Sequence, residues 1–193
     1  MTDSLHKRYI YKFIGNSVGL LISVVTQSII PRGLGPKAYG DFNFLTTFFT
    51  EAVSFLDMGT SEGFYIKLSQ RQQDSGLVLF YLLYALSVAL AICSFVGASA
   101  IASTHTYFWP NQSYFYIILA AIWALLSWLV QIMNKMGDAF GLTVSAELAR
   151  IIQKGIGLTL ILFLFLFNSL NLANFFFTTI SSWYFSGWPL PGL

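Results

Sequence analysis

Polar side chains recur at regular intervals within an otherwise apolar stretch between residues 42 and 61. Successive members of this polar stripe are four, three, four, three and four residues apart, which places them on one continuous face of an α-helix. They are Asn43, Thr47, Thr50, Ser54, Asp57 and Ser61. The opposite face carries mostly Phe, Leu and Ala, so one wall suits lipid or packing and the other suits something polar.

Two carboxylates belong to this segment, because Asp57 lies in the polar stripe and Glu51 lies at its edge. A carboxylate in the middle of a membrane helix costs about 2.5–3.5 kcal/mol, against roughly −0.3 to −0.6 kcal/mol for each Phe or Leu. We therefore expect the segment to sit inside a bundle, with Glu51 facing a partner or a hydrated cavity. Intramembrane acids often mark transport or proton paths, which favours function over simple hydrogen bonding to neighbouring helices.

A weaker polar side occurs in the apolar stretch between residues 9 and 30. Gly15, Gly19 and Ser23 form a ridge of small residues at a spacing of four, which permits close packing between helices. Packing does not explain why Lys12, Asn16 and Gln27 share that side.

A third polar pattern lies near residue 150, where Glu147, Arg150 and Lys154 are three and four residues apart on one helical face. For these we predict a solvated, ion-paired turn at the cytoplasmic end of a helix.

The residues of enzyme chemistry are scarce. The chain has two histidines, both outside the apolar stretches, and one cysteine, Cys93, which we expect to be a buried apolar residue. No HExxH, CxxC or P-loop motif occurs, and no Ser-His-acid set can be assembled. We expect no catalytic residues, no metal site and no cofactor, which points away from an enzyme and toward transport.

Composition defines the elements that must position these residues. Hydrophobic residues make up 56% of the 193, and charged residues only 9%, against about 25% in soluble domains. The sequence predicts an all-α, multi-pass transmembrane helix bundle in a single domain, because a bilayer accommodates such a surface. Apolar runs long enough to cross give five full spans and a partial sixth, at about residues 9–30, 42–66, 77–101, 114–133, 151–170 and 174–190.

Lysine and arginine placement predicts the orientation. With those spans, eight of the ten basic residues fall on one side of the membrane and only Arg32 and Lys37 on the other. Positive loops stay cytoplasmic, so we expect a cytoplasmic N-terminus and outward-facing loops at residues 31–41 and 102–113. The net charge of +2 is too small to suggest a nucleic-acid partner.

Two segments resemble the polysaccharide and O-antigen flippases of the multidrug/oligosaccharidyl-lipid/polysaccharide exporter superfamily. The first is the turn between the first two predicted spans, Arg32-Gly33-Leu34-Gly35-Pro36-Lys37-Ala38-Tyr39-Gly40. The second closes the polar stripe, Phe55-Leu56-Asp57-Met58-Gly59-Thr60-Ser61. The likeness covers roughly residues 5–180 in helix layout and residues 31–63 in specific motif.

This resemblance implies a transporter that moves a lipid-linked oligosaccharide or polysaccharide precursor across the cytoplasmic membrane by alternating access. Asn43, Thr47, Thr50 and Ser54 become candidates for substrate binding. Arg32 is a candidate for a pyrophosphate group, with an interfacial anchor as an equal alternative. Asp41, Glu51 and Asp57 become candidates for binding a coupling ion or proton.

Such transporters are usually more than twice as long, so we expect an N-terminal fragment or truncated product that lacks the second repeat. It could be inactive alone or act as a homo-oligomer. The main alternative is a non-transporting scaffold or subunit of a polysaccharide-assembly complex. A membrane-embedded transferase of the same pathway ranks last, because it needs a reactive cluster that the sequence does not show.

Overall fold

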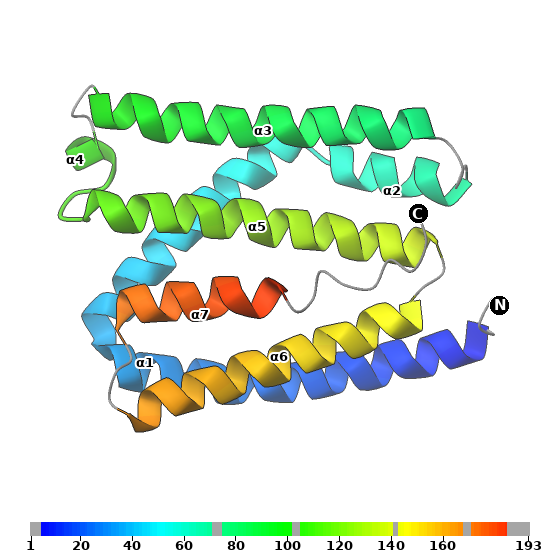
Figure 1. Ribbon diagram of the computed structural model, residues 1–193, viewed down its shortest axis with the longest axis horizontal. Helices are drawn as coiled ribbons and strands as arrows, with labels where there is room; N and C mark the ends of the chain where they lie inside the picture. The colour runs from blue at the N-terminus through cyan, green and yellow to red at the C-terminus, as the bar shows by residue number, and fades with distance from the viewer. Residues whose placement is uncertain (1–4, 71–74, 102–104, 141–142, 168–170, 185–193) are drawn as a thin grey trace. The chain divides into compact units, whose positions relative to one another are not determined.

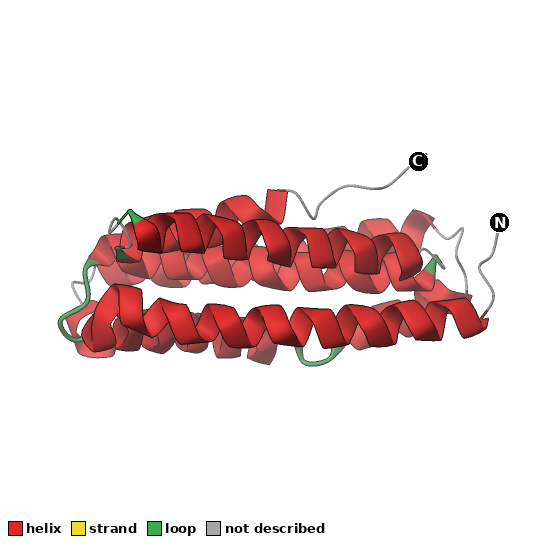
Figure 2. Ribbon diagram, turned by 90° about the horizontal axis from the view of Figure 1, so that it is seen from below, coloured by secondary structure: helices red, strands yellow, loops and turns green. Residues whose placement is uncertain are grey.

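The computed structural model describes residues 5–70, 75–101, 105–140, 143–167 and 171–184, and all regular structure in these ranges is helical (Figures 1 and 2). Four of the helices are long and apolar enough to cross a membrane. The chain is therefore an all-α membrane protein, as the composition predicts. The number of crossings and the side on which the N-terminus lies stay predictions. The helices are α1 (Leu5–Asp57), α2 (Thr60–Gln70), α3 (Ser75–Ile101), α4 (His105–Phe108), α5 (Tyr114–Ala139), α6 (Thr143–Leu166) and α7 (Leu172–Tyr184).

Helix α1 replaces the first predicted span, the predicted loop and most of the second span. Its backbone leaves helical geometry at Gly35, with φ 78° and ψ 161°, so α1 consists of a first arm (residues 5–34) and a second arm (residues 36–57). The predicted loop at residues 31–41 is therefore wrong. One residue is enough for the break, because glycine adopts positive φ without strain and Pro36 can begin the next helical segment without a missing hydrogen bond.

The second predicted span, residues 42–66, is interrupted. Helix α1 ends at Asp57, and α2 begins at Thr60 after two residues with positive φ, Met58 at 44° and Gly59 at 80°. The Gly59 carbonyl accepts hydrogen bonds from the amides of Glu62 and Gly63, which starts the new helix. Ser61 therefore lies in α2, and the polar stripe is not one unbroken rod.

The remaining helices follow the predicted spans, with shifted ends. Helix α3 agrees to within two residues, whereas α5 continues past residue 133 to Ala139. Helix α6 begins at Thr143, before the predicted residue 151, and ends at Leu166. Helix α7 covers the first part of the predicted 174–190 segment, whose residues 185–190 lie outside the described residues.

The chain divides into two compact units. The terminal unit (residues 1–39 and 133–193) contains the first arm of α1, the end of α5, α6 and α7, and α6 packs against α7. The central unit (residues 40–132) contains most of the second arm of α1, all of α2, α3 and α4, and most of α5. The polar stripe lies in the central unit, and the face of Glu147, Arg150 and Lys154 lies in the terminal unit.

Candidate functional site

The core of the central unit is aromatic and fixes which side of the second arm faces inward. Phe49 and Trp109 are both fully buried and stack with ring centroids 5.6 Å apart. Phe48 meets the edge of Trp109 at 5.3 Å, and Leu45 and Val53 are buried on the same face of the arm. Burying this large apolar face supplies the main stabilisation of the unit, and it leaves the polar stripe on the opposite side.

The part of the polar stripe between residues 43 and 54 consequently lies at the surface of the central unit, whereas Ser61 is buried. Thr47 and Ser54 are exposed, and Asn43 and Thr50 are half-buried. Glu51 is also exposed, on the same helical arm. In the described part of the chain, the structure brings these four substrate-binding candidates together along one side of one helix, as the spacing predicts.

The other two predicted acids hold structural hydrogen bonds in the central unit. Asp41 accepts a hydrogen bond from the side-chain amide of Gln112 at 2.7 Å, which ties the start of the second arm to the loop after α4. Asp57 accepts a hydrogen bond from the Ser61 hydroxyl at 2.5 Å, across the break between α1 and α2. Both contacts give these carboxylates a structural role, whatever further role they have.

Tyrosines of α3 complete the polar cluster at the helix break, and sequence analysis missed them. Ser61 Oγ lies 2.7 Å from the Tyr81 hydroxyl, and Tyr84 donates its hydroxyl proton to the Leu56 carbonyl at 2.6 Å. Tyr81 also stacks on Phe64 with ring centroids 4.1 Å apart. Tyr84 thus satisfies a carbonyl at the C-terminus of α1, which helices otherwise leave without a partner. The sequence held one signal for this cluster, because Tyr81 and Tyr84 are three residues apart and put two hydroxyl groups on one side of an apolar helix.

Arg32, the predicted pyrophosphate ligand, is exposed and lies in the terminal unit. The other seven predicted site residues lie in the central unit. A joint role of Arg32 with the polar stripe stays a prediction.

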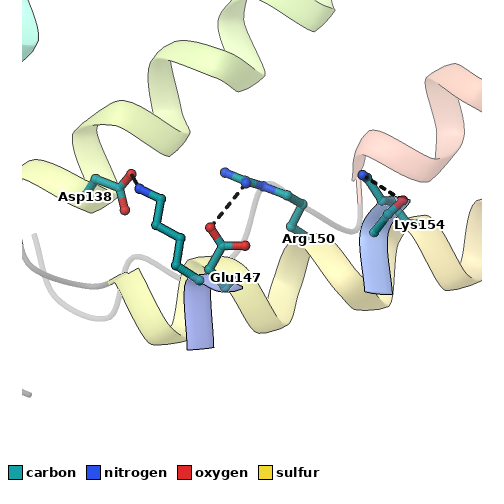
Figure 3. A network of polar contacts seen from close by, with 6 residues as sticks. Asp138, Glu147, Arg150 and Lys154 are labelled. Carbon is teal, nitrogen blue, oxygen red and sulfur yellow. Dashed lines mark hydrogen bonds and ion pairs between the residues drawn. The ribbon is translucent and has the colours of Figure 1, made fainter. Parts of the chain in front are cut away.

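The face of Glu147, Arg150 and Lys154 is not the solvated turn that we predicted. Glu147 is buried, with a side chain 2% exposed, and its Oε1 accepts from Arg150 Nη1 at 3.2 Å (Figure 3). Lys154 Nζ donates to the Gly19 carbonyl at 3.3 Å. Helix α6 therefore turns its charged face toward the first arm of α1, inside the terminal unit.

Two glycines of α1 make this approach possible. A Cβ atom at Gly15 would lie 2.8 Å from Glu147 Oε2, and one at Gly19 would lie 2.8 Å from Lys154 Nζ. The predicted ridge of small residues is thus a packing surface, and its partners are charged side chains. Lys12, one turn earlier, reaches Asp138 of α5 at 3.3 Å, which accounts for a lysine on that side.

Other features of the described residues add no reactive chemistry. No group of three or more His, Cys, Asp or Glu side chains in these ranges could hold a metal ion. Cys93 is exposed on α3 and not buried as predicted, because it faces outward from a helix whose other side packs inward.

Fold and site together define an α-helical membrane protein with polar side chains on two of its helical faces. The chain belongs to the polysaccharide biosynthesis protein family, whose family model matches residues 5–190. That match confirms the resemblance seen in the sequence. No curated protein and no solved structure gives a significant match.

Proposed function

We propose that this protein moves a lipid-linked oligosaccharide or polysaccharide precursor across the cytoplasmic membrane, and that it is a transporter and not an enzyme. The family places the chain in polysaccharide biosynthesis. The observation that carries the proposed activity is the polar stripe on the outer surface of the central unit.

Energetics support a polar occupant for this surface. A helix arm that crosses the bilayer normally turns polar groups away from lipid, because hydrocarbon offers them no hydrogen bonds. Here the side of the arm that carries Phe49 is buried in the aromatic core, so the hydroxyls of Thr47 and Ser54 face outward. A hydrated path or a glycan headgroup supplies donors and acceptors that match these hydroxyls.

Within this proposal, the residues have distinct roles. Asn43, Thr47, Thr50 and Ser54 contact the glycan, and Arg32 pairs with the pyrophosphate that links it to lipid. Glu51 is the best candidate for a coupling ion or proton, because it is exposed beside the stripe. Asp41 and Asp57 are the other two candidates for this role, and they lie near the two ends of the second arm.

Cysteine accessibility tests the polar surface directly. Single cysteines replace Thr47 or Ser54 in a Cys93→Ser background, with Phe44→Cys and Phe55→Cys as controls, since both phenylalanines are exposed on the same arm. In membranes, a charged, membrane-impermeant thiol reagent should label the stripe positions and leave the control positions unlabelled. Uniform protection of all four would contradict the proposal and favour the scaffold alternative.

A transport assay tests the activity itself. The chain is expressed in cells that lack their own transporter for a lipid-linked oligosaccharide, and delivery of the glycan to the outer surface is measured. Thr47→Leu and Ser54→Leu should lower delivery, whereas Phe44→Leu should not. If Glu51→Ala and Arg32→Ala leave delivery unchanged, the roles assigned to those two residues are wrong.

A further inference from the structure

The contact between α6 and the first arm of α1 holds more positive than negative charge. Its side chains form two ion pairs whose charges cancel, Lys12 with Asp138 and Arg150 with Glu147 (Figure 3). Lys154 is the fifth charged group, and its Nζ donates to the neutral carbonyl of Gly19 at 3.3 Å. Among the described residues no carboxylate pairs with Lys154, so one positive charge lacks a counter-charge.

This unbalanced charge is costly because Lys154 lies inside a helix that is apolar enough to cross a membrane. The apolar part of α6 runs from Glu147 to Leu166, and Lys154 is half-buried about two turns from its start. Charged residues in such segments are rare, and they pair with other groups or extend toward the interface. Side chains on a helix lean toward its N-terminus, so Lys154 extends toward the end of α6 that carries Arg150.

Arg150 adds further hydrogen-bond donors on the same face of α6. It lies one turn before Lys154, and the two side chains leave the helix on the same side (Figure 3). Like charges at this spacing repel each other. A guanidinium has five N–H donors, and among the described residues the one contact of Arg150 is that of Nη1 with Glu147. The Arg150 side chain is 31% exposed, so its other donors are open to a ligand.

The ligand that suits these two cations is the phosphate of an anionic lipid. Arg donates paired hydrogen bonds to phosphate oxygens, and Lys binds phosphate as a point charge. The two residues lie where α6 enters its apolar stretch, and at the edge of the hydrocarbon core a bilayer presents its headgroups. Basic side chains between membrane helices bind anionic headgroups at this level. A headgroup with one net negative charge also balances the single excess positive charge of the contact.

We propose that Arg150 and Lys154 bind the phosphate of an anionic phospholipid beside the contact between α1 and α6. The guanidinium donates through the N–H groups that Glu147 leaves unused, and the ammonium through those that the Gly19 carbonyl leaves unused. Glu147 does not take the place of the phosphate, because its carboxylate is buried against Gly15 and already paired with Arg150. The bound lipid completes the charge balance of the contact, and this role does not require movement of a glycan.

Thermal unfolding of the purified full chain in lipid-doped micelles tests this site. The chain is stripped of lipid and titrated with phosphatidylglycerol or with phosphatidylethanolamine, which carries the same phosphate and no net charge. The stabilisation at each lipid concentration gives an apparent Kd, and we expect tighter binding of phosphatidylglycerol. Inorganic phosphate at the same concentration should not stabilise the chain. Equal stabilisation by inorganic phosphate would assign the site to a soluble anion and contradict a lipid ligand.

Lys154→Gln tests the unbalanced charge. It should weaken the binding of phosphatidylglycerol about fivefold and leave phosphatidylethanolamine unaffected, whereas Lys154→Arg should bind like the native chain. Lys67→Gln is the matched control, because it removes one positive charge at an exposed position of α2, and it should leave both affinities unchanged. If Lys154 only ties α6 to the Gly19 carbonyl, Lys154→Gln will lower the stability equally in both lipids.

Arg150 is tested together with its partner, because Arg150→Gln alone would leave Glu147 buried without a counter-charge. The double variant Glu147→Gln, Arg150→Gln keeps the net charge of the contact, yet it should weaken the binding of phosphatidylglycerol because the phosphate loses its guanidinium donors.

Three results would overturn the proposal. They are equal affinity of the native chain for the two lipids, a preference that neither Lys154→Gln nor the double variant lowers, and equal weakening by Lys67→Gln. The assay measures lipid binding whether or not the chain moves a glycan. A negative result here would leave the transport proposal standing, and a failed transport assay would leave this site untouched.

Discussion

The two arms of α1 carry similar patterns and use them in opposite ways. The first arm places small and polar residues on one side, and that side packs against the charged face of α6 at Gly15 and Gly19. The second arm also places polar residues on one side, yet its apolar side packs around Phe49 and Trp109, and the polar stripe faces outward. The first arm thus buries its glycines in the terminal unit, where Lys12, Asn16 and Gln27 stay exposed, and the second arm buries its apolar side in the central unit.

The difference shows that a polar stripe alone does not say which face of a membrane helix is buried. Glycine lacks a Cβ, so the first arm admits a carboxylate and a lysine close to its backbone. The second arm has phenylalanines opposite its stripe, and these bury far more apolar area than the hydroxyls could recover in hydrogen bonds. The size of the side chains on each face therefore decides which face of the helix is buried.

The largest expected effect lies in the aromatic core of the central unit. Phe49→Ala removes a fully buried ring stacked on Trp109 and should cost about 3–5 kcal/mol of unfolding free energy. Phe55→Ala, at a ring 70% exposed on the same arm, should change it by less than about 0.5 kcal/mol. Unfolding of the purified chain by a denaturing detergent, followed by circular dichroism, measures both. Equal effects would show that the apolar side of the second arm is not the buried side.

An intermediate effect is expected where the first arm meets α6. Gly15→Ala adds a methyl group 2.8 Å from Glu147 Oε2, and because the carboxylate end of this side chain can shift, the cost should be at the low end of overpacking, about 1 kcal/mol. Gly155→Ala is the control within α6, because a Cβ there meets nothing within 4 Å, and it should be neutral or slightly stabilising. The same detergent unfolding assay compares them. A neutral Gly15→Ala would mean that Glu147 does not press against α1.

The smallest effect is expected at the exposed end of the same contact. Lys12→Gln removes the ion pair with Asp138, whose side chains are 48% and 22% exposed. Pairs this accessible contribute about 0.2–1 kcal/mol, and salt should weaken the contribution further. Unfolding free energies of the native chain and the variant are compared at low and high salt. A large loss that salt does not reduce would show that Lys12 is part of a buried network with Glu147.

The sequence by itself determined the class of protein and the helical character of its elements. A composition with few charges and long apolar runs leaves a membrane helix bundle as the outcome, because hydrocarbon requires every backbone polar group to be paired within a helix. The helical repeat of 3.6 residues alone placed Asn43, Thr47, Thr50 and Ser54 on one side of a helix. The segment around Gly35 and Pro36 carried part of the family resemblance.

Only the tertiary structure decided where helices break and which polar groups are buried. The break after Asp57 depends on Met58 and Gly59 adopting positive φ and on Tyr84 satisfying the Leu56 carbonyl from another helix. The burial of Glu147 depends on Gly15, more than a hundred residues earlier in the chain. The helical period shows which residues share a face. Whether that face is buried depends on the shape and charge of the helix that packs against it, and the sequence alone does not show which helix that is.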